Sequence, residues 1–107
     1  MVRSVSFASL AEVRDTIDAL DDQLVALLAE RLAAIRRASE LKGEPSDARV
    51  EWRVDEVANR VRLRAGEVGF DADAAERIWR GMMEECIAFE TEAIAARRHS
   101  KASGRRT

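Results

Sequence analysis

Few features of a secreted, membrane-bound or loop-rich protein occur in this sequence of 107 residues. A single cysteine, Cys86, excludes an internal disulfide and fits a reducing cytoplasm. One proline and five glycines argue against a chain of many turns. No apolar run reaches the length of a transmembrane helix, and the first residues lack the apolar stretch of a secretory signal. We therefore expect a cytoplasmic protein that does not span a membrane.

Metal-site and nucleic-acid signals are also scarce. The only histidine, His99, lies near the C-terminus, so we expect neither a metal cluster nor another cofactor. A formal net charge of −2 argues against a globally basic nucleic-acid binder. Hydrophobic residues make up 47% of the chain and charged residues 36%, which is typical of one globular domain.

What the sequence does contain is helical periodicity. Apolar residues recur every three or four positions over residues 10–41, which predicts one long amphipathic helix. Ser9 followed by Glu12 forms a capping box at its start, and the segment 43–47 contains the breakers Gly43 and Pro45. The apolar positions are Leu10, Val13, Ile17, Leu20, Leu24, Leu27, Leu28, Ile35, Ala38 and Leu41.

Two further helices are expected, at about 48–67 and 72–97. A valine stripe marks the second, and Asp71 is a suitable N-cap for the third. No strand pattern of useful length is present, so the predicted fold is all-α. The predicted organisation is an N-terminal extension over 1–8, a helical domain over 9–97, and a basic disordered tail over 98–107.

The first helix is long for so small a chain. About 32 helical residues span roughly 48 Å, whereas a compact domain of this size has a radius of gyration of about 13 Å. Since the apolar stripe runs almost end to end, a second chain is expected to cover the excess, most simply in a two-fold homodimer. The alternative is a bent or broken helix in a monomeric three-helix bundle.

Two cations interrupt the apolar stripe of the first helix. Arg31 and Lys42 share its direction within about 20° and lie roughly 16 Å apart along the axis. Because an unpaired buried cation is costly, each should meet an anion. They either converge on a small dianion or pair with glutamates of other helices. Arg14 faces about 100° away from Arg31, so it can serve the pocket of a second protomer more readily than its own.

Charged residues on the other two helices offer further candidates. Arg53 stands closest to the loop that carries Lys42 and is the best candidate for inward use. Glu90 interrupts an apolar line on the third helix, either as a functional carboxyl group or in a structural salt bridge to an arginine. The remaining arginines of the second helix's stripe are expected on the surface: Arg49, Arg60 and Arg64.

These residues, in this order, resemble the all-helical chorismate mutases. The first helix reads VRDTIDALDDQLVALLAERLAAI, with an arginine near its start, an I-D-x-L-D element and an L-L-x-x-R element. The resemblance continues through Lys42, Arg53 and Glu90 and covers about residues 9–95. It implies an intertwined all-α homodimer of three-helix protomers, in which each long first helix is shared between two active sites.

The resemblance also implies roles for the charged residues. Arg14 of one protomer would join four residues of the other protomer, which are Arg31, Lys42, Arg53 and Glu90. The three arginines would bind the carboxylates of a small dianionic substrate. Lys42 and Glu90 would donate hydrogen bonds to the ether oxygen of chorismate as it rearranges to prephenate. Glu90 can donate only when protonated, so activity should fall as the pH rises.

Three residues bear on substrate choice. Val50 and Val54 stand where related mutases often use acidic or amide side chains to bind the ring hydroxyl, and Cys86 stands where a small polar residue can occur. An apolar Val54 and a short connection from Lys42 to Arg53 also resemble the isochorismate-pyruvate lyases of the same fold. Those enzymes form salicylate and pyruvate. A mutase acting on an amino analogue of chorismate is a further possibility.

The sequence also leaves two functions open that are not enzymatic. One is a non-catalytic helical dimerisation or regulatory module, which the retained cations disfavour. The other is nucleic-acid binding by the tail, whose basic run is more typical of a solubilising segment. The basic residues of this run are Arg97, Arg98, Lys101, Arg105 and Arg106.

Overall fold

The computed structural model describes residues 7–41 and 49–104, with side chains to residue 100. It contains three helices: α1 over Leu10–Glu40, α2 over Glu51–Val68 and α3 over Ala72–Gly104. No strand occurs in these two ranges, and the expected all-α fold is confirmed. None of the described helices is both long enough and apolar enough to cross a lipid bilayer.

The ends of α1 lie where the sequence predicts them. The hydroxyl of Ser9 accepts a hydrogen bond from the backbone N–H of Glu12 at 3.2 Å, which satisfies one of the free donors of the first turn. The carboxylate of Glu12 reaches back to the N–H of Ala8 at 2.6 Å. At the other end, Leu41 caps the helix and donates its N–H to the carbonyl of Ala38 at 3.0 Å.

The predicted start of α2 is wrong by three residues. Val50 is extended and serves as an N-cap without a side-chain hydrogen bond, so the helix begins at Glu51 and not near residue 48. Its end is well defined, because Gly69 adopts a left-handed conformation with φ of 77°. The N–H of Phe70 then bonds to the carbonyl of Ala65 at 2.8 Å, closing the last turn.

The start of α3 is confirmed, since the N–H of Asp73 donates to the carboxylate of Asp71 at 3.1 Å. Its end is not. The helix continues past the expected Arg97 to Gly104, so the backbone of 98–104 is helical rather than disordered. Neither glycine nor proline occurs between Arg97 and Gly104, so no strong breaker stops the helix earlier.

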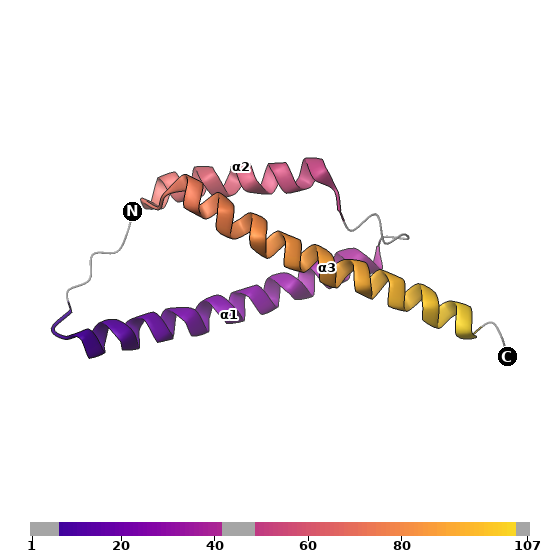
Figure 1. Cartoon of the computed structure of the whole chain (residues 1–107), viewed down its shortest axis with the longest axis horizontal. Coiled ribbons are helices and arrows are strands. Elements are labelled where there is room, and N and C mark those ends of the chain that lie inside the picture. Colours follow the sequence, from indigo (N-terminus) through magenta and orange to yellow (C-terminus); the bar gives the residue numbers. More distant parts are fainter. Residues whose placement is uncertain (1–6, 42–48, 105–107) are drawn as a thin grey trace.

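The three helices do not form a compact bundle. Helices α2 and α3 run antiparallel and pack along each other, while α1 runs in the same direction as α3 and meets it through its C-terminal part (Figure 1). The radius of gyration is 18.6 Å and the longest extent is 67 Å, well beyond a compact domain of this length. The buried apolar side chains of the described residues lie only on α2 and α3: Ala58, Ala65, Ala75, Met83 and Ile94.

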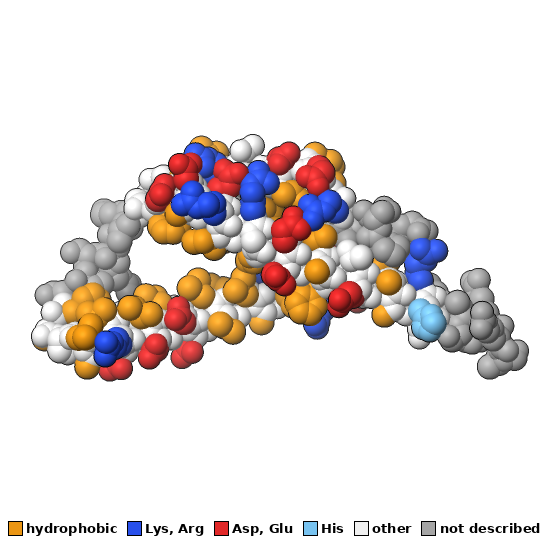
Figure 2. Space-filling model, in the orientation of Figure 1, with side chains coloured by type: hydrophobic (Ala, Val, Ile, Leu, Met, Phe, Trp, Pro, Cys, Tyr) orange, Lys and Arg blue, Asp and Glu red, His pale blue; other side chains and the backbone are white. Residues whose placement is uncertain are grey.

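The N-terminal part of α1 is uncovered. Leu20 is 51% exposed and Leu24 is 54% exposed, although both belong to the apolar stripe. Figure 2 shows apolar side chains of α1 facing an open space beneath α2 and α3. A contiguous apolar face of this kind is unusual on a soluble monomer.

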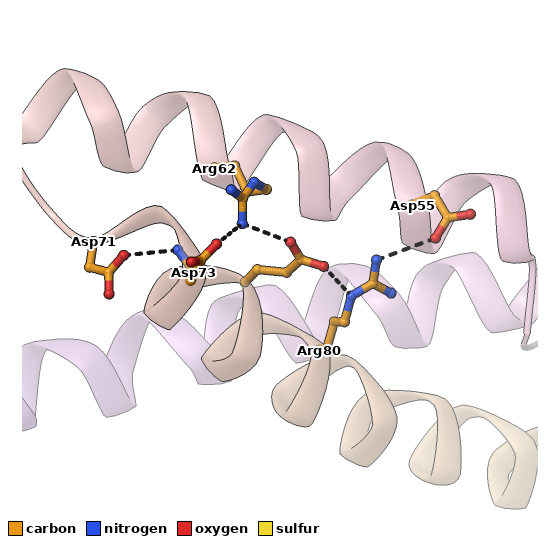
Figure 3. Close-up of polar contacts among 6 residues, drawn as sticks. Asp55, Arg62, Asp71, Asp73 and Arg80 are labelled. Atoms are coloured by element: carbon orange, nitrogen blue, oxygen red, sulfur yellow. Dashed lines mark hydrogen bonds and ion pairs between the residues drawn. The ribbon is translucent and has the colours of Figure 1, made fainter.

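Ion pairs join α2 to α3 at their solvent edge (Figure 3). Arg62 of α2 donates to Asp73 at 2.8 Å and to Glu76 at 3.0 Å, both on α3. Arg80 of α3 donates to Glu76 at 2.7 Å and to Asp55 of α2 at 3.4 Å. The hydrogen bond from Arg62 lowers the pKa of Asp73, and that from Arg80 contributes most to lowering the pKa of Glu76.

Candidate active site

A cavity of about 480 Å³, here called the main cavity, lies where all three helices approach one another. Helix α1 contributes its C-terminal part, α2 its first two turns and N-cap, and α3 its middle. Most of the lining is apolar, with two arginines and one glutamate among it. The lining residues are Arg31, Ala34, Ile35, Ala38, Val50, Trp52, Arg53, Val54, Val57, Met83, Cys86, Ile87 and Glu90.

Arg31 enters this cavity from α1, as its position on the apolar stripe predicts. It is half-buried, and its Nη1 lies 3.7 Å from the Sγ of Cys86 on α3. A thiol is only a weak hydrogen-bond acceptor. Among the described residues no carboxylate forms a salt bridge with Arg31, so its charge is available to an anionic ligand.

Arg53 enters from α2 and is more exposed. Its Nη1 pairs with Glu56 one turn along the same helix, and the Arg53 side chain is 51% exposed. An exposed pair of this kind contributes little to stability. A bound carboxylate could therefore replace Glu56 as the partner of Arg53 at small cost.

Glu90 is buried, with 6% of its surface exposed, and lines the main cavity from α3. Its neighbours along the helix face, Met83 and Ile94, are also buried. The inward position expected from the helical period is confirmed. The arrangement therefore places a carboxyl group in a largely apolar wall, in the same cavity as the guanidinium groups of Arg31 and Arg53.

Besides Arg53 and the indole N–H of Trp52, the described α2 side chains that line the cavity are apolar. Val50 and Val54 both line the cavity, as does Val57. Trp52 also lines the cavity. Helical periodicity does not predict this position, because at 100° per residue Trp52 points about 160° away from Val54. Its position in the first helical turn, beside the extended Val50, brings it to the cavity edge.

A second cavity of about 650 Å³ adjoins the first and is bounded by α1, α2 and α3. Arg60 and Arg64 were expected on the surface; they are exposed, yet they line this second cavity. Arg49, in contrast, lies outside both cavities and pairs with Glu84 and with Glu51. The lining consists of Arg31, Arg53, Val57, Arg60, Val61, Leu63, Arg64, Glu67 and Trp79, so both cavities share Arg31, Arg53 and Val57.

One predicted site residue, Arg14, does not line the main cavity of its own chain. Arg14 is exposed on the N-terminal part of α1 and lines neither cavity. Lys42 lies outside the described residues. One chain therefore brings together Arg31, Arg53, Cys86 and Glu90 with the two valines, but leaves Arg14 apart.

The chemistry open to this site follows from its side chains. Within residues 7–41 and 49–104, no group of histidine, cysteine and acidic side chains is arranged to hold a metal ion. Two arginines can hold carboxylates through bidentate hydrogen bonds, and a buried carboxyl group can accept a hydrogen bond or, when protonated, donate one. The site is therefore suited to bind and orient a small, partly apolar anion.

Comparison with known proteins identifies the family. No curated protein matches the chain. The family model for chorismate mutase type II matches residues 13–91, from the first turn of α1 to just past Glu90 on α3. This match covers most of the chain and includes every described residue of the main cavity. The protein therefore belongs to the chorismate mutase type II family.

Proposed function

We propose that the protein is a chorismate mutase, an isomerase that rearranges chorismate to prephenate. The observation that carries this proposal is the main cavity, in which Arg31, Arg53 and Glu90 meet in an otherwise apolar lining. The size of about 480 Å³ suits one small molecule. Family membership supplies the reaction class.

The reaction is a unimolecular pericyclic shift, so it needs neither a nucleophile nor a metal ion. The protein must hold a compact conformer of the substrate and stabilise the negative charge that grows on the ether oxygen. In our proposal, Arg31 and Arg53 bind the carboxylates through their planar guanidinium groups. Lys42 and protonated Glu90 donate hydrogen bonds to the ether oxygen.

We also propose that the enzyme is a homodimer with shared sites. The uncovered apolar face of α1 needs a partner, and Arg14 lies on that same exposed part of the helix. A second copy that packs there would bring its own Arg14 to the main cavity. The single cysteine suits a cytoplasmic enzyme, and prephenate formation would serve aromatic amino acid biosynthesis by the shikimate pathway.

The apolar α2 wall favours a second candidate function. Val50 and Val54 offer no hydrogen bond to a ring hydroxyl. Isochorismate carries its hydroxyl at another ring carbon, so an isochorismate-pyruvate lyase would tolerate this wall. Such a lyase forms salicylate and pyruvate, also in a pericyclic step.

One paired assay decides between these functions. The purified protein is incubated with chorismate and with isochorismate, and prephenate and salicylate are measured. Prephenate as the dominant product supports the mutase, and salicylate as the dominant product replaces it with the lyase. If neither product forms, and millimolar prephenate leaves Tm unchanged, the chain is a non-catalytic helical module.

A mixing experiment tests the shared site. Arg14→Ala and Arg31→Ala are each expected to be inactive as homodimers. If the chains exchange, half of the dimers are mixed, and each mixed dimer holds one intact site, which restores about a quarter of wild-type activity. Absence of any recovery, with exchange verified by mass spectrometry, would contradict a site shared between chains.

A further inference from the structure

Arg97 of α3 contacts the last turn of α1. Its Nη1 donates to the hydroxyl of Ser39 at 3.4 Å, and its Nη2 donates to the backbone carbonyl of Ser39. Ser39 is only 2% exposed, and its hydroxyl donates in turn to the carbonyl of Arg36 at 2.7 Å. Arg97 is half-buried in this arrangement. A basic residue expected at the edge of a disordered tail thus makes a defined contact with α1.

The contact has a clear physical basis. The last carbonyls of a helix lack partners within the helix, and the C-terminal end carries partial negative charge. The N–H of Leu41 bonds to the carbonyls of Ala38 and Ser39. Arg97 adds a charged donor to this end from a neighbouring helix, where Ser39 is shielded from water. A charge-assisted hydrogen bond in that setting is stronger than a neutral one.

Arg97 also occupies a defined position relative to the main cavity. Glu90, Ile94 and Arg97 follow one another at i, i+4 and i+7, so they share one face of α3. Upstream on this helix, Cys86 contacts Arg31 of α1; downstream, Arg97 contacts Ser39 of α1. Because α1 and α3 run in the same direction (Figure 1), these two contacts bracket Glu90 along the helix pair.

We propose that Arg97 is a positioning residue that fixes the register of α3 against α1. Through this register it sets the distance between Glu90 and Arg31 across the main cavity. Arg97 does not line the cavity itself. Its effect on turnover rests on the proposed function, whereas its effect on the helix pair does not.

The first test measures turnover of the dominant substrate by Arg97→Ala and Arg97→Lys. We expect Arg97→Ala to lower kcat roughly tenfold or more with little change in KM, because misplaced groups lose transition-state contacts more than ground-state binding. Arg97→Lys should recover part of this loss, since it keeps a cation at the helix end. It also provides a folded variant if Arg97→Ala does not fold.

Arg37→Ala is the matched control. Arg37 lies in the same last turn of α1, is 68% exposed and pairs only with Glu40 of its own helix among the described residues. Its removal should leave kcat unchanged. If Arg97→Ala lowers Tm but keeps wild-type kcat well below that temperature, its role is purely structural and the proposal is overturned.

A second readout is independent of activity. Cys86 is the only cysteine of the chain and lies half-buried between α1 and α3, so its reaction rate with a thiol reagent such as Ellman's reagent reports on their packing. We expect a several-fold faster reaction in Arg97→Ala and no change in Arg37→Ala. Unchanged Cys86 reactivity would overturn the proposal. If the wild-type protein turns over neither substrate, the proposed function fails, and this measurement still decides the role of Arg97.

Discussion

The two ends of α1 carry one continuous apolar stripe but lie in opposite surroundings. Its N-terminal part leaves Leu20 and Leu24 about half exposed, whereas its C-terminal part lines the main cavity and holds the buried Ser39 against α3. Sequence alone does not distinguish these ends. The difference indicates that α1 is longer than its own chain can cover, and a second copy supplies the missing surface in our proposal.

The largest effect is expected from Leu24→Asp, which places a charge on the uncovered part of the stripe. If a second copy packs there, burial of this charge prevents dimer formation, and a shared site then loses almost all activity. Light scattering gives the oligomeric state, and the turnover assay gives the activity. Ala26→Asp is the control, since it lies two residues further and faces the opposite side of α1. If Leu24→Asp and Ala26→Asp associate equally and are equally active, no second copy packs on the apolar stripe of the N-terminal part of α1.

Arg31→Ala tests the other end of α1. Loss of one preorganised donor in an electrostatic site costs about a hundredfold or more in kcat/KM. We expect this loss for the dominant substrate, together with an unchanged oligomeric state, so that binding and assembly are separated. Arg37→Ala is again the control on the same helix. A loss of less than about threefold would mean that Arg31 does not bind substrate.

Glu90→Gln probes the buried carboxyl group that lines the main cavity together with Arg31. Glu90→Ala removes the proposed donor to the ether oxygen, so its kcat/KM should fall about a hundredfold or more. Glutamine keeps an amide donor of similar size, so Glu90→Gln should retain activity. The turnover assay measures both variants; full activity in Glu90→Ala, or loss of activity in a folded Glu90→Gln, would contradict this role.

The smallest effect concerns the ion pairs that hold α2 to α3. The pKa of Asp73 and that of Glu76 are lowered in the folded chain, below ordinary values of 3.8 and 4.5. The stability from these groups is therefore present above the ordinary values and is lost as the pH falls through the lowered ones. Arg62→Ala should lower Tm by a few degrees at most at pH 7 and shrink the Tm difference between pH 7 and about pH 3. Arg37→Ala is the control and should leave the Tm difference between the two pH values unchanged. If Arg62→Ala also leaves it unchanged, these ion pairs do not stabilise the packing of α2 against α3.

Local signals explain what could be predicted of the fold. The cap at Ser9 and the glycine at position 69 act within one turn, so the ends of α1 and α2 that they control are readable from sequence. The start of α2 was not, because Val50 caps the helix without a side-chain hydrogen bond and leaves no residue signature. The continuation of α3 to Gly104 was also missed, because a polar and basic composition does not prevent a helix.

The candidate site also contains features that local sequence patterns predict and features that they do not. Periodicity within one helix correctly placed Arg31 and Glu90 on inward faces. The contact between Arg97 and Ser39 and the second cavity depend on how the helices cross, which periodicity does not encode. Arg60 and Arg64 illustrate this, since both are exposed on α2 and still line that cavity.

Arg31 and Arg53 line both cavities, so the dianion that we propose for the main cavity would share these two side chains with a molecule that fills the second cavity. If a second subunit fills the second cavity, ligand binding and subunit association are thermodynamically linked. Ligand that tightens subunit association by some factor must itself be bound more tightly, by the same factor, in the assembled form. Dilution of the protein would then weaken the apparent affinity for the ligand, and saturating ligand would protect the assembly against dilution.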